Sequence, residues 1–181
     1  MSKRTLFSAA AVSVALGLSG CVTAPSPDEV RAPAPLKPVN LERFYSGRWL
    51  EIARLPMRLT DGCVAGATNY VVVEPTRVDV RDTCQVDTPE GREKAIGGRG
   101  EILDPGTNAR LRVRYLAGFV TWDYWVLDHA EDYSWFISAD PTFDKLWIYT
   151  RDVPGPAERE ALVARAAALG YDVSRLEFPE F

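Results

Sequence analysis

The chain has little histidine and little cysteine. Its 181 residues include one histidine and three cysteines, and because two of these cysteines are expected to pair with each other, too few ligands remain for a zinc site. The histidine lies in Asp128-His129-Ala130-Glu131-Asp132, a segment typical of an exposed turn, and offers no convincing ligand for haem or another pigment. No serine or cysteine nucleophile stands in a motif, and the nearby acidic residues lack calcium-site spacing. We therefore expect no enzyme activity, no metal and no cofactor.

The chain also lacks an excess of basic residues. It has 21 Lys and Arg against 25 Asp and Glu, which gives a formal net charge of −4. Loss of the N-terminal signal described below removes two basic residues, which leaves 19 against 25 and a net charge of −6. Nucleic acid binding depends on a positive surface that neutralises phosphates. We therefore expect no nucleic acid partner.

No apolar run has the roughly 20 residues that a bilayer crossing requires. The longest, residues 6–18, follows the basic residues Lys3 and Arg4, an order typical of a secretory signal. The segment that ends it, Leu18-Ser19-Gly20-Cys21, resembles the lipobox of bacterial lipoproteins. This resemblance implies that residues 1–20 are removed and that Cys21 becomes an N-terminus carrying several acyl chains such as palmitate. An ordinary secretory signal with an incidental cysteine is the alternative.

The residues after the signal predict where the protein resides and how it is tethered. Val22, rather than aspartate, follows Cys21, and by the same resemblance this implies a lipid anchor in the bacterial outer membrane, with the domain facing the periplasm. Residues 21–37 are rich in proline and have no apolar periodicity, which predicts an extended, semi-rigid tether. The remaining residues, 38–181, are enough for one domain with a substantial core.

Short strand-like runs separated by turn residues fill most of this domain. In the fifth run, Leu111, Val113 and Tyr115 alternate with three arginines, the pattern of a strand with one buried face and one solvated face. A spacing of about 10 residues between runs predicts an antiparallel sandwich or barrel. The predicted strands are residues 49–55, 64–73, 78–84, 94–103, 109–116, 123–128, 135–139 and 145–150.

The pattern changes after the eighth run. Residues 156–169 have apolar positions at helical spacing, with Pro156 in the first turn and Gly170 as the stop signal. One amphipathic helix packed outside the sheet is therefore predicted. Residues 171–178 predict a short final strand.

Cys63 and Cys84 remain when Cys21 is assigned to lipid. An even pair in an oxidising compartment is expected to be bonded. Both flank runs that would form a hairpin, which places them opposite each other near its open end. Such a bond closes a loop of about 20 residues and stabilises by roughly 3 kcal/mol. Two free buried thiols are the alternative.

Three motifs in this order resemble the signatures of the lipocalin family. Residues 41–54, which contain Gly47-Arg48-Trp49, look like the first signature; residues 123–128 look like the second; residues 146–151 look like the third. The second has the form seen in bacterial outer-membrane lipocalins and apolipoprotein D. The resemblance covers about residues 38–178 and implies an all-β fold: an eight-stranded antiparallel up-and-down barrel, with one C-terminal α-helix outside and a short final strand.

The resemblance also implies how one end of this barrel is closed. Gly47 permits a tight entry into the first strand, and Trp49 supplies a large apolar plug. The last strand of a closed barrel lies beside the first, so Arg151 can lie over the Trp49 indole. A cation–π pair of this kind contributes roughly 0.5 to 2 kcal/mol. These three residues are expected to be structural.

The lipocalin resemblance implies a barrel that binds one small hydrophobic ligand, with lysophospholipids or fatty acids as the leading candidates for storage or transport. Alternation along the strands predicts which side chains face the interior, although Trp125 competes with Tyr124 and Val126, and Glu51 would need a polar head group or water. The alternatives are a structural envelope lipoprotein with a filled barrel and a lipid-modifying enzyme, and a homodimer stays open. The predicted ligand-binding residues are Glu51, Thr68, Tyr70, Val72, Leu111, Val113, Tyr115, Trp125, Trp147 and Tyr149.

Overall fold

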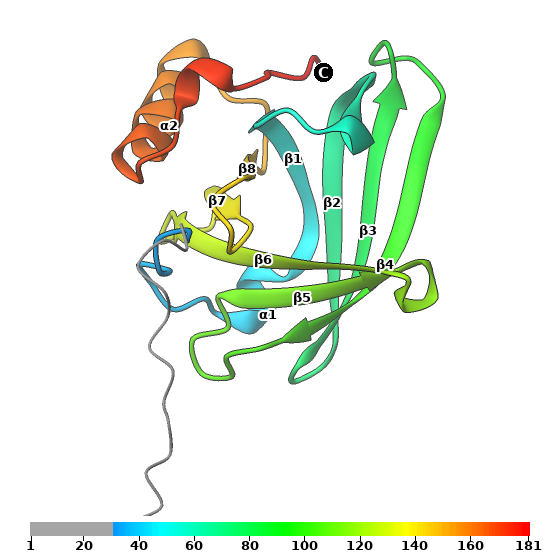
Figure 1. Cartoon of the computed structure of the whole chain (residues 1–181), viewed down its shortest axis with the longest axis vertical. Helices are drawn as coiled ribbons and strands as arrows, with labels where there is room; N and C mark the ends of the chain where they lie inside the picture. Colours follow the sequence, from blue (N-terminus) through cyan, green and yellow to red (C-terminus); the bar gives the residue numbers. More distant parts are fainter. Residues whose placement is uncertain (1–30) are drawn as a thin grey trace, which may run out of the picture.

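The computed structural model describes residues 31–181, so the predicted signal and Cys21 lie outside the described residues. Eight antiparallel strands pair in sequence order, and β8 pairs with β1 to close a barrel (Figure 1). The predicted fold class is therefore confirmed. The strands are β1 (Ser46–Arg54), β2 (Cys63–Glu74), β3 (Arg77–Val86), β4 (Glu93–Ile102), β5 (Arg110–Tyr115), β6 (Val120–His129), β7 (Trp135–Ala139) and β8 (Leu146–Thr150).

One end of the barrel is its base and the other its mouth. The short helix α1 (Leu41–Phe44) leads into β1 at the base, and the chain reaches the base again after β8. Two 3₁₀ turns, η1 (Arg58–Thr60) and η2 (Leu116–Gly118), lie in the β1–β2 and β5–β6 connections. These connections lie at the opposite end, because β1 and β5 both run from the base to the mouth.

The helix α2 (Pro156–Ala168) covers the outside of the barrel, as predicted (Figure 1). Pro156 occupies its first turn, and Gly170 follows its end with a φ of 95°, a conformation that favours glycine. The buried side chains of Leu162 and Ala166 belong to a second apolar cluster that includes Ile148 on the outer face of β8. In the described part of the chain, no helix combines the length and apolarity needed to cross a bilayer.

The predicted final strand, residues 171–178, is wrong. The segment forms the 3₁₀ turn η3 (Val173–Arg175), and its extended part makes one isolated bridge between Arg54 and Glu177. The Asp172 side chain accepts a hydrogen bond from the Ser174 amide at 3.2 Å, which favours the turn. In addition, β1 pairs with β2 over Ser46–Leu50 and with β8 over Leu50–Arg54, and the C-terminal segment meets the remaining edge of β1 only at Arg54.

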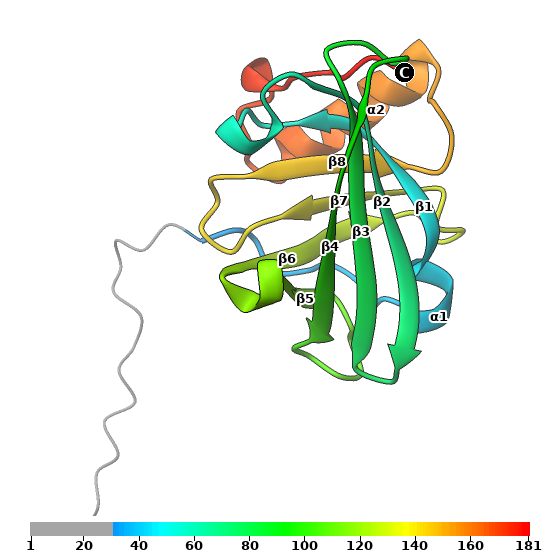
Figure 2. The same ribbon diagram turned by 90° about the vertical axis from the view of Figure 1, so that its right-hand side faces the viewer.

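The described part of the predicted tether lies against the barrel. The Ala32 amide donates to the Pro141 carbonyl in the β7–β8 loop at 3.1 Å, and the Leu36 amide donates to the Leu127 carbonyl at 2.9 Å. Lys37 Nζ lies 3.3 Å from the Asp128 carboxylate. The segment begins beside the β7–β8 loop and runs toward the base (Figure 2). Residues 32–37 are therefore held by specific contacts.

The prediction that His129 lies in an exposed turn is also wrong. β6 continues to His129, whose side chain is buried. Its Nε2 lies 3.0 Å from the Pro38 carbonyl oxygen, and its ring stacks on Tyr133 with a centroid distance of 4.8 Å. The acidic residues around it belong partly to the strand and partly to ion pairs with the incoming N-terminal segment, so their polarity does not indicate a loop.

Candidate functional site

Arg151 closes the base of the barrel by lying over Trp49. The guanidinium carbon stands 3.4 Å from the Trp49 ring centroid. Its Nη1 donates to the carbonyls of Ser46 at 2.8 Å and Arg48 at 2.9 Å. Gly47 between them has a φ of 63°, a left-handed conformation that favours glycine in the tight turn that presents these carbonyls. Burial lowers the pKa of Arg151, yet the π face and the carbonyls give it partners that carry no charge.

Aromatic side chains fill the interior directly above the base. The Trp49 ring lies 5.4 Å from Phe44 and 4.7 Å from Phe136, and Phe136 stacks on Tyr149 at 4.6 Å. The Trp49 indole also donates to the Phe44 carbonyl at 3.1 Å. This part of the barrel is therefore solid, and any ligand must lie above it.

A cavity of about 420 Å³ opens above this floor. It lies within the usual size range of small-molecule sites, and its surface is mostly apolar and aromatic. Seven of the ten predicted residues line it: Glu51, Thr68, Tyr70, Val113, Tyr115, Trp147 and Tyr149.

The other three predicted residues lie elsewhere. Leu111 is buried in the core and Val72 packs against that core, and neither borders the cavity. Trp125 packs with the outer cluster, where Arg110 lies 4.5 Å from its ring centroid. Its neighbours Trp122 and Tyr124 line the cavity instead, so the ambiguity on this strand resolves against Trp125.

Several polar residues of the cavity were not predicted from the sequence. The most important are Arg54 and Asp82. Asp82 could have been found by the alternation rule, because it follows the inward-facing Val78 and Val80 at the same spacing. Arg54 had no such signal, because its role depends on partners from three different segments.

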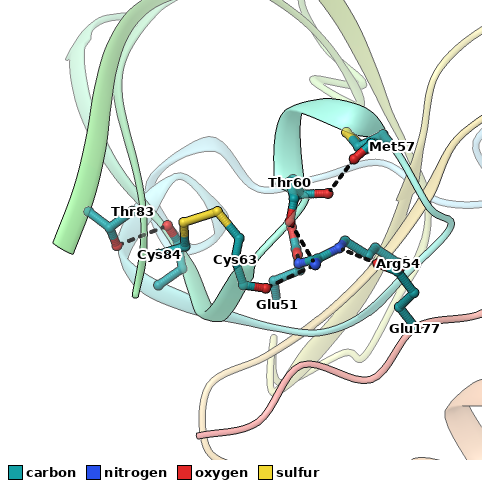
Figure 3. The surroundings of a disulfide bond; sticks show 9 residues. Glu51, Arg54, Met57, Thr60, Cys63, Thr83, Cys84 and Glu177 are labelled. Carbon is teal, nitrogen blue, oxygen red and sulfur yellow. Dashed lines mark hydrogen bonds and ion pairs between the residues drawn. A yellow bond between two sulfur atoms is a disulfide. The ribbon is translucent and has the colours of Figure 1, made fainter. Parts of the chain in front are cut away.

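Arg54 and Glu51 form a buried ion pair at the edge of the cavity. Their nitrogen and oxygen atoms are 2.7 Å apart, and Arg54 also donates to the carbonyls of Thr60 at 3.2 Å and Cys63 at 2.9 Å. A further contact at 3.1 Å reaches Glu177 in the C-terminal segment (Figure 3). Burial raises the pKa of Glu51, and the neighbouring guanidinium opposes this rise. Glu51 thus has a charged partner within the protein, which its position on the strand alone did not indicate.

Asp82 is the second carboxylate of the cavity. It accepts a hydrogen bond from the Tyr115 hydroxyl at 2.6 Å and one from the Thr68 hydroxyl at 2.7 Å. Tyr124 extends this network, with its hydroxyl 3.2 Å from that of Tyr115. Burial raises the pKa of Asp82, and the two hydroxyl donors act in the opposite direction.

The disulfide between Cys63 and Cys84 lies at the mouth, and its prediction is confirmed. The bond joins β2 to β3 with a Cα–Cα distance of 5.4 Å, and both residues border the cavity (Figure 3). It holds the start of β2 and the connection carrying η1 beside the Arg54 cluster. Within residues 31–181, no group of three or more His, Cys, Asp or Glu side chains is placed to hold a metal ion.

The family described as "Lipocalin-like domain" matches residues 39–180. The chain is 34% identical over 151 residues to temperature-induced lipocalin-1 of Arabidopsis thaliana, with 78% of each chain covered. It is 28% identical over 124 residues to rabbit (Oryctolagus cuniculus) apolipoprotein D, with 67% of this chain and 62% of the relative covered.

Solved structures share the fold at low sequence identity. Insecticyanin from the tobacco hornworm Manduca sexta superposes with a TM-score of 0.60 at 19% identity, covering 84% of this chain and 89% of its own. The amine binding protein of Rhodnius prolixus, solved as a tryptamine complex, gives 0.61 at 12% identity, covering 83% and 85%. The closed barrel with its Trp49–Arg151 base agrees with the sequence and structure matches. The chain belongs to the lipocalin family, whose members bind small hydrophobic ligands.

Proposed function

We propose that this lipocalin binds a single hydrophobic molecule, a lysophospholipid or a fatty acid, in its cavity and stores or transports it in the cell envelope. The observation that carries the proposal is the cavity of about 420 Å³ with a mostly apolar and aromatic wall. Burying an acyl chain contributes about 0.8 kcal/mol per methylene. Binding of this kind needs no chemical step, and we infer a carrier without turnover.

Membrane anchoring through Cys21 is part of the proposal. Its support is the sequence Leu18-Ser19-Gly20-Cys21 and the proline-rich segment that follows. At about 3.5 Å per extended residue, the residues between Cys21 and Ala32 can span at most roughly 35 Å. We propose the outer membrane as the site of anchoring, with the barrel on the periplasmic side.

The orientation of the barrel fits a ligand taken from that membrane. Ala32 contacts Pro141 in the β7–β8 loop, which lies at the mouth because β8 runs from the mouth to the base. The mouth also carries exposed apolar side chains: Leu59 is 62% exposed, Leu116 58% and Phe119 91%. A tether that leaves beside an apolar rim supports a mouth held close to the lipid surface.

Mass spectrometry of lipid extracted from the purified, non-denatured protein, together with tryptophan fluorescence, tests the proposal. Recovery of an intact lysophospholipid or fatty acid is expected. Addition of the recovered lipid to the delipidated protein should change the fluorescence, because Trp122 and Trp147 border the cavity. Replacing both with phenylalanine should abolish this change, whereas the matched control Trp125→Phe, on the outer face, should preserve it.

Two results would contradict the proposal. The absence of both co-purifying lipid and any fluorescence change would favour a structural lipoprotein with a filled barrel. Hydrolysis of an added ester lipid by the purified protein, lost on heat denaturation, would favour a lipid-modifying enzyme.

A further inference from the structure

The charged groups of the cavity differ in how many of their hydrogen-bonding positions are occupied by partners within the protein. Arg54 is only 5% exposed, and each of its three nitrogens already donates to Glu51, to Glu177 or to backbone carbonyls. A guanidinium with these partners has little capacity left for a ligand anion. Lys94, the other cation of the wall, is exposed on β4 opposite Cys84 at the mouth, where water screens its charge.

Asp82, by contrast, retains capacity to bind. Its carboxylate has about four acceptor positions, and two hydroxyl groups occupy two of them. None of the ion pairs among residues 31–181 includes Asp82. The residue is half-buried because it borders the cavity, so a ligand can reach it.

The second carboxylate, Glu51, adds to the negative electrostatic potential that Asp82 creates in the cavity. Glu51 directs one oxygen to Arg54 at 2.7 Å, while its other oxygen has only the Tyr149 hydroxyl at 3.5 Å. The inner wall therefore holds two carboxylates and one guanidinium. A free carboxylate placed among them would add a third negative charge in a poorly solvated space, whereas a cation would be stabilised there.

From this arrangement we infer that the cavity selects amphiphiles whose head group carries a protonated amine, with Asp82 as its counter-ion, over those that end in a free carboxylate. The inference rests on the proposed function and narrows its ligand class. An ammonium offers three donors to the open positions of Asp82 and to the Tyr115 and Tyr124 hydroxyl oxygens around it. Burial raises the pKa of Asp82, and a bound ammonium would lower it by favouring the charged carboxylate.

The position of Asp82 explains why the interaction would be selective. Its inward-facing neighbours on β3 are Val80 toward the base and Cys84 toward the mouth, so apolar side chains flank it. Charge-assisted hydrogen bonds are stronger where water is excluded. The apolar walls accept any hydrocarbon chain of suitable length, and the choice among head groups falls to the carboxylate.

Three probes with the same ten-carbon chain test the inference: decylamine, decanol and decanoate. Their affinities for the delipidated full-length protein would be measured at pH 7 by tryptophan fluorescence. We expect decylamine to bind at least tenfold more tightly than decanoate, with decanol between them. Asp82→Asn should weaken decylamine binding about tenfold and leave decanol binding unchanged. The matched control Asp79→Asn, on the same strand but exposed, should change neither.

The outcomes separate this inference from the proposed function. If all three probes bind equally, or decanoate binds most tightly, the amine selectivity is wrong and the hydrophobic binding function stands. If none of the three binds, both proposals are wrong. If Asp82→Asn fails to fold, the order of the three probes on the unmodified protein still decides, because decanoate binding as tightly as decylamine overturns the inference.

Discussion

The base contains one partly buried arginine and the cavity one buried arginine, and the two have different kinds of partner. Arg151 at the base lies over the Trp49 ring and donates to backbone carbonyls, which are neutral partners. Arg54 at the cavity pairs with the carboxylates of Glu51 and Glu177. The base therefore holds a guanidinium without a carboxylate partner. The inner wall of the cavity holds two carboxylates, Glu51 and Asp82, but only one guanidinium, that of Arg54.

This difference separates stability from binding. At the base the Trp49 indole and the Arg151 guanidinium have fixed partners and rings fill the space, so a substitution there acts mainly on the free energy of unfolding. In the cavity, Asp82 has open acceptor positions and its burial opposes its charge. Groups that are poorly satisfied in the free protein are the ones that a ligand can stabilise.

Removal of the base plug should have the largest effect on stability. Trp49 is fully buried and contacts Phe44, Phe136 and Arg151. We expect Trp49→Ala to lower the free energy of unfolding by about 3–5 kcal/mol, because it leaves a cavity and removes the ring beneath the Arg151 guanidinium. Urea denaturation measures this loss.

Because the base and the cavity are separate, the Trp49→Ala variant should also keep its affinity for ligands. Below its unfolding transition, Trp49→Ala should bind the ten-carbon probes with nearly unchanged affinity, since the indole does not border the cavity. Trp125→Ala, on the outer face, serves as the control and should lose less stability. Normal stability with abolished binding would show that the base is part of the binding site.

Loss of the disulfide should have the next largest effect. The bond between Cys63 and Cys84 closes a loop across a sequence separation of 21 residues. Under oxidising conditions, we expect Cys63→Ser to lower the free energy of unfolding by roughly 3 kcal/mol. A reducing agent should bring the unmodified protein close to the variant and leave the variant unchanged. Equal thermal stability of the two under oxidising conditions would contradict a stabilising role for the bond at the mouth.

Substitution of Asp82 should have the smallest effect on the free energy of unfolding, and it should raise this free energy where the two other substitutions lower it. Burial raises the pKa of this carboxyl above that of the unfolded chain, so the folded state binds more protons and stability falls as pH rises through that interval. Asp82→Asn should match the unmodified protein near pH 3 and exceed it by about 1 kcal/mol at pH 8.

Urea denaturation at several pH values measures this difference. Besides the hydroxyls of Thr68, Tyr115 and Tyr124, the nearby titratable groups are Tyr70, Tyr149 and the Glu51–Arg54 pair. They are present in both proteins and cancel in the comparison. Asp79→Asn should give a flat difference. A loss of stability at pH 8 would mean that the hydrogen bonds of the Asp82 carboxylate outweigh its desolvation.

Regular alternation explains why much of the barrel was predictable. The fifth predicted strand placed Val113 and Tyr115 inward correctly, because its arginines marked the solvated face. On β6 the rule gave no answer, since Trp122, Tyr124 and Trp125 are all aromatic and a register shift lies between Val126 and Asp128. The final strand was predicted from apolar residues that instead pack against the outer cluster.

Local periodicity and short motifs were enough to predict the number and order of the barrel strands, the external helix and the family. The even pair of remaining cysteines was enough to predict the disulfide. The charged groups that surround the cavity could be identified only from the folded barrel. The partners of Arg54 come from residues 51, 60, 63 and 177, and those of Asp82 from residues 68 and 115. Closure of the barrel brings these distant groups together, and the balance of burial and charge among them depends on that closure.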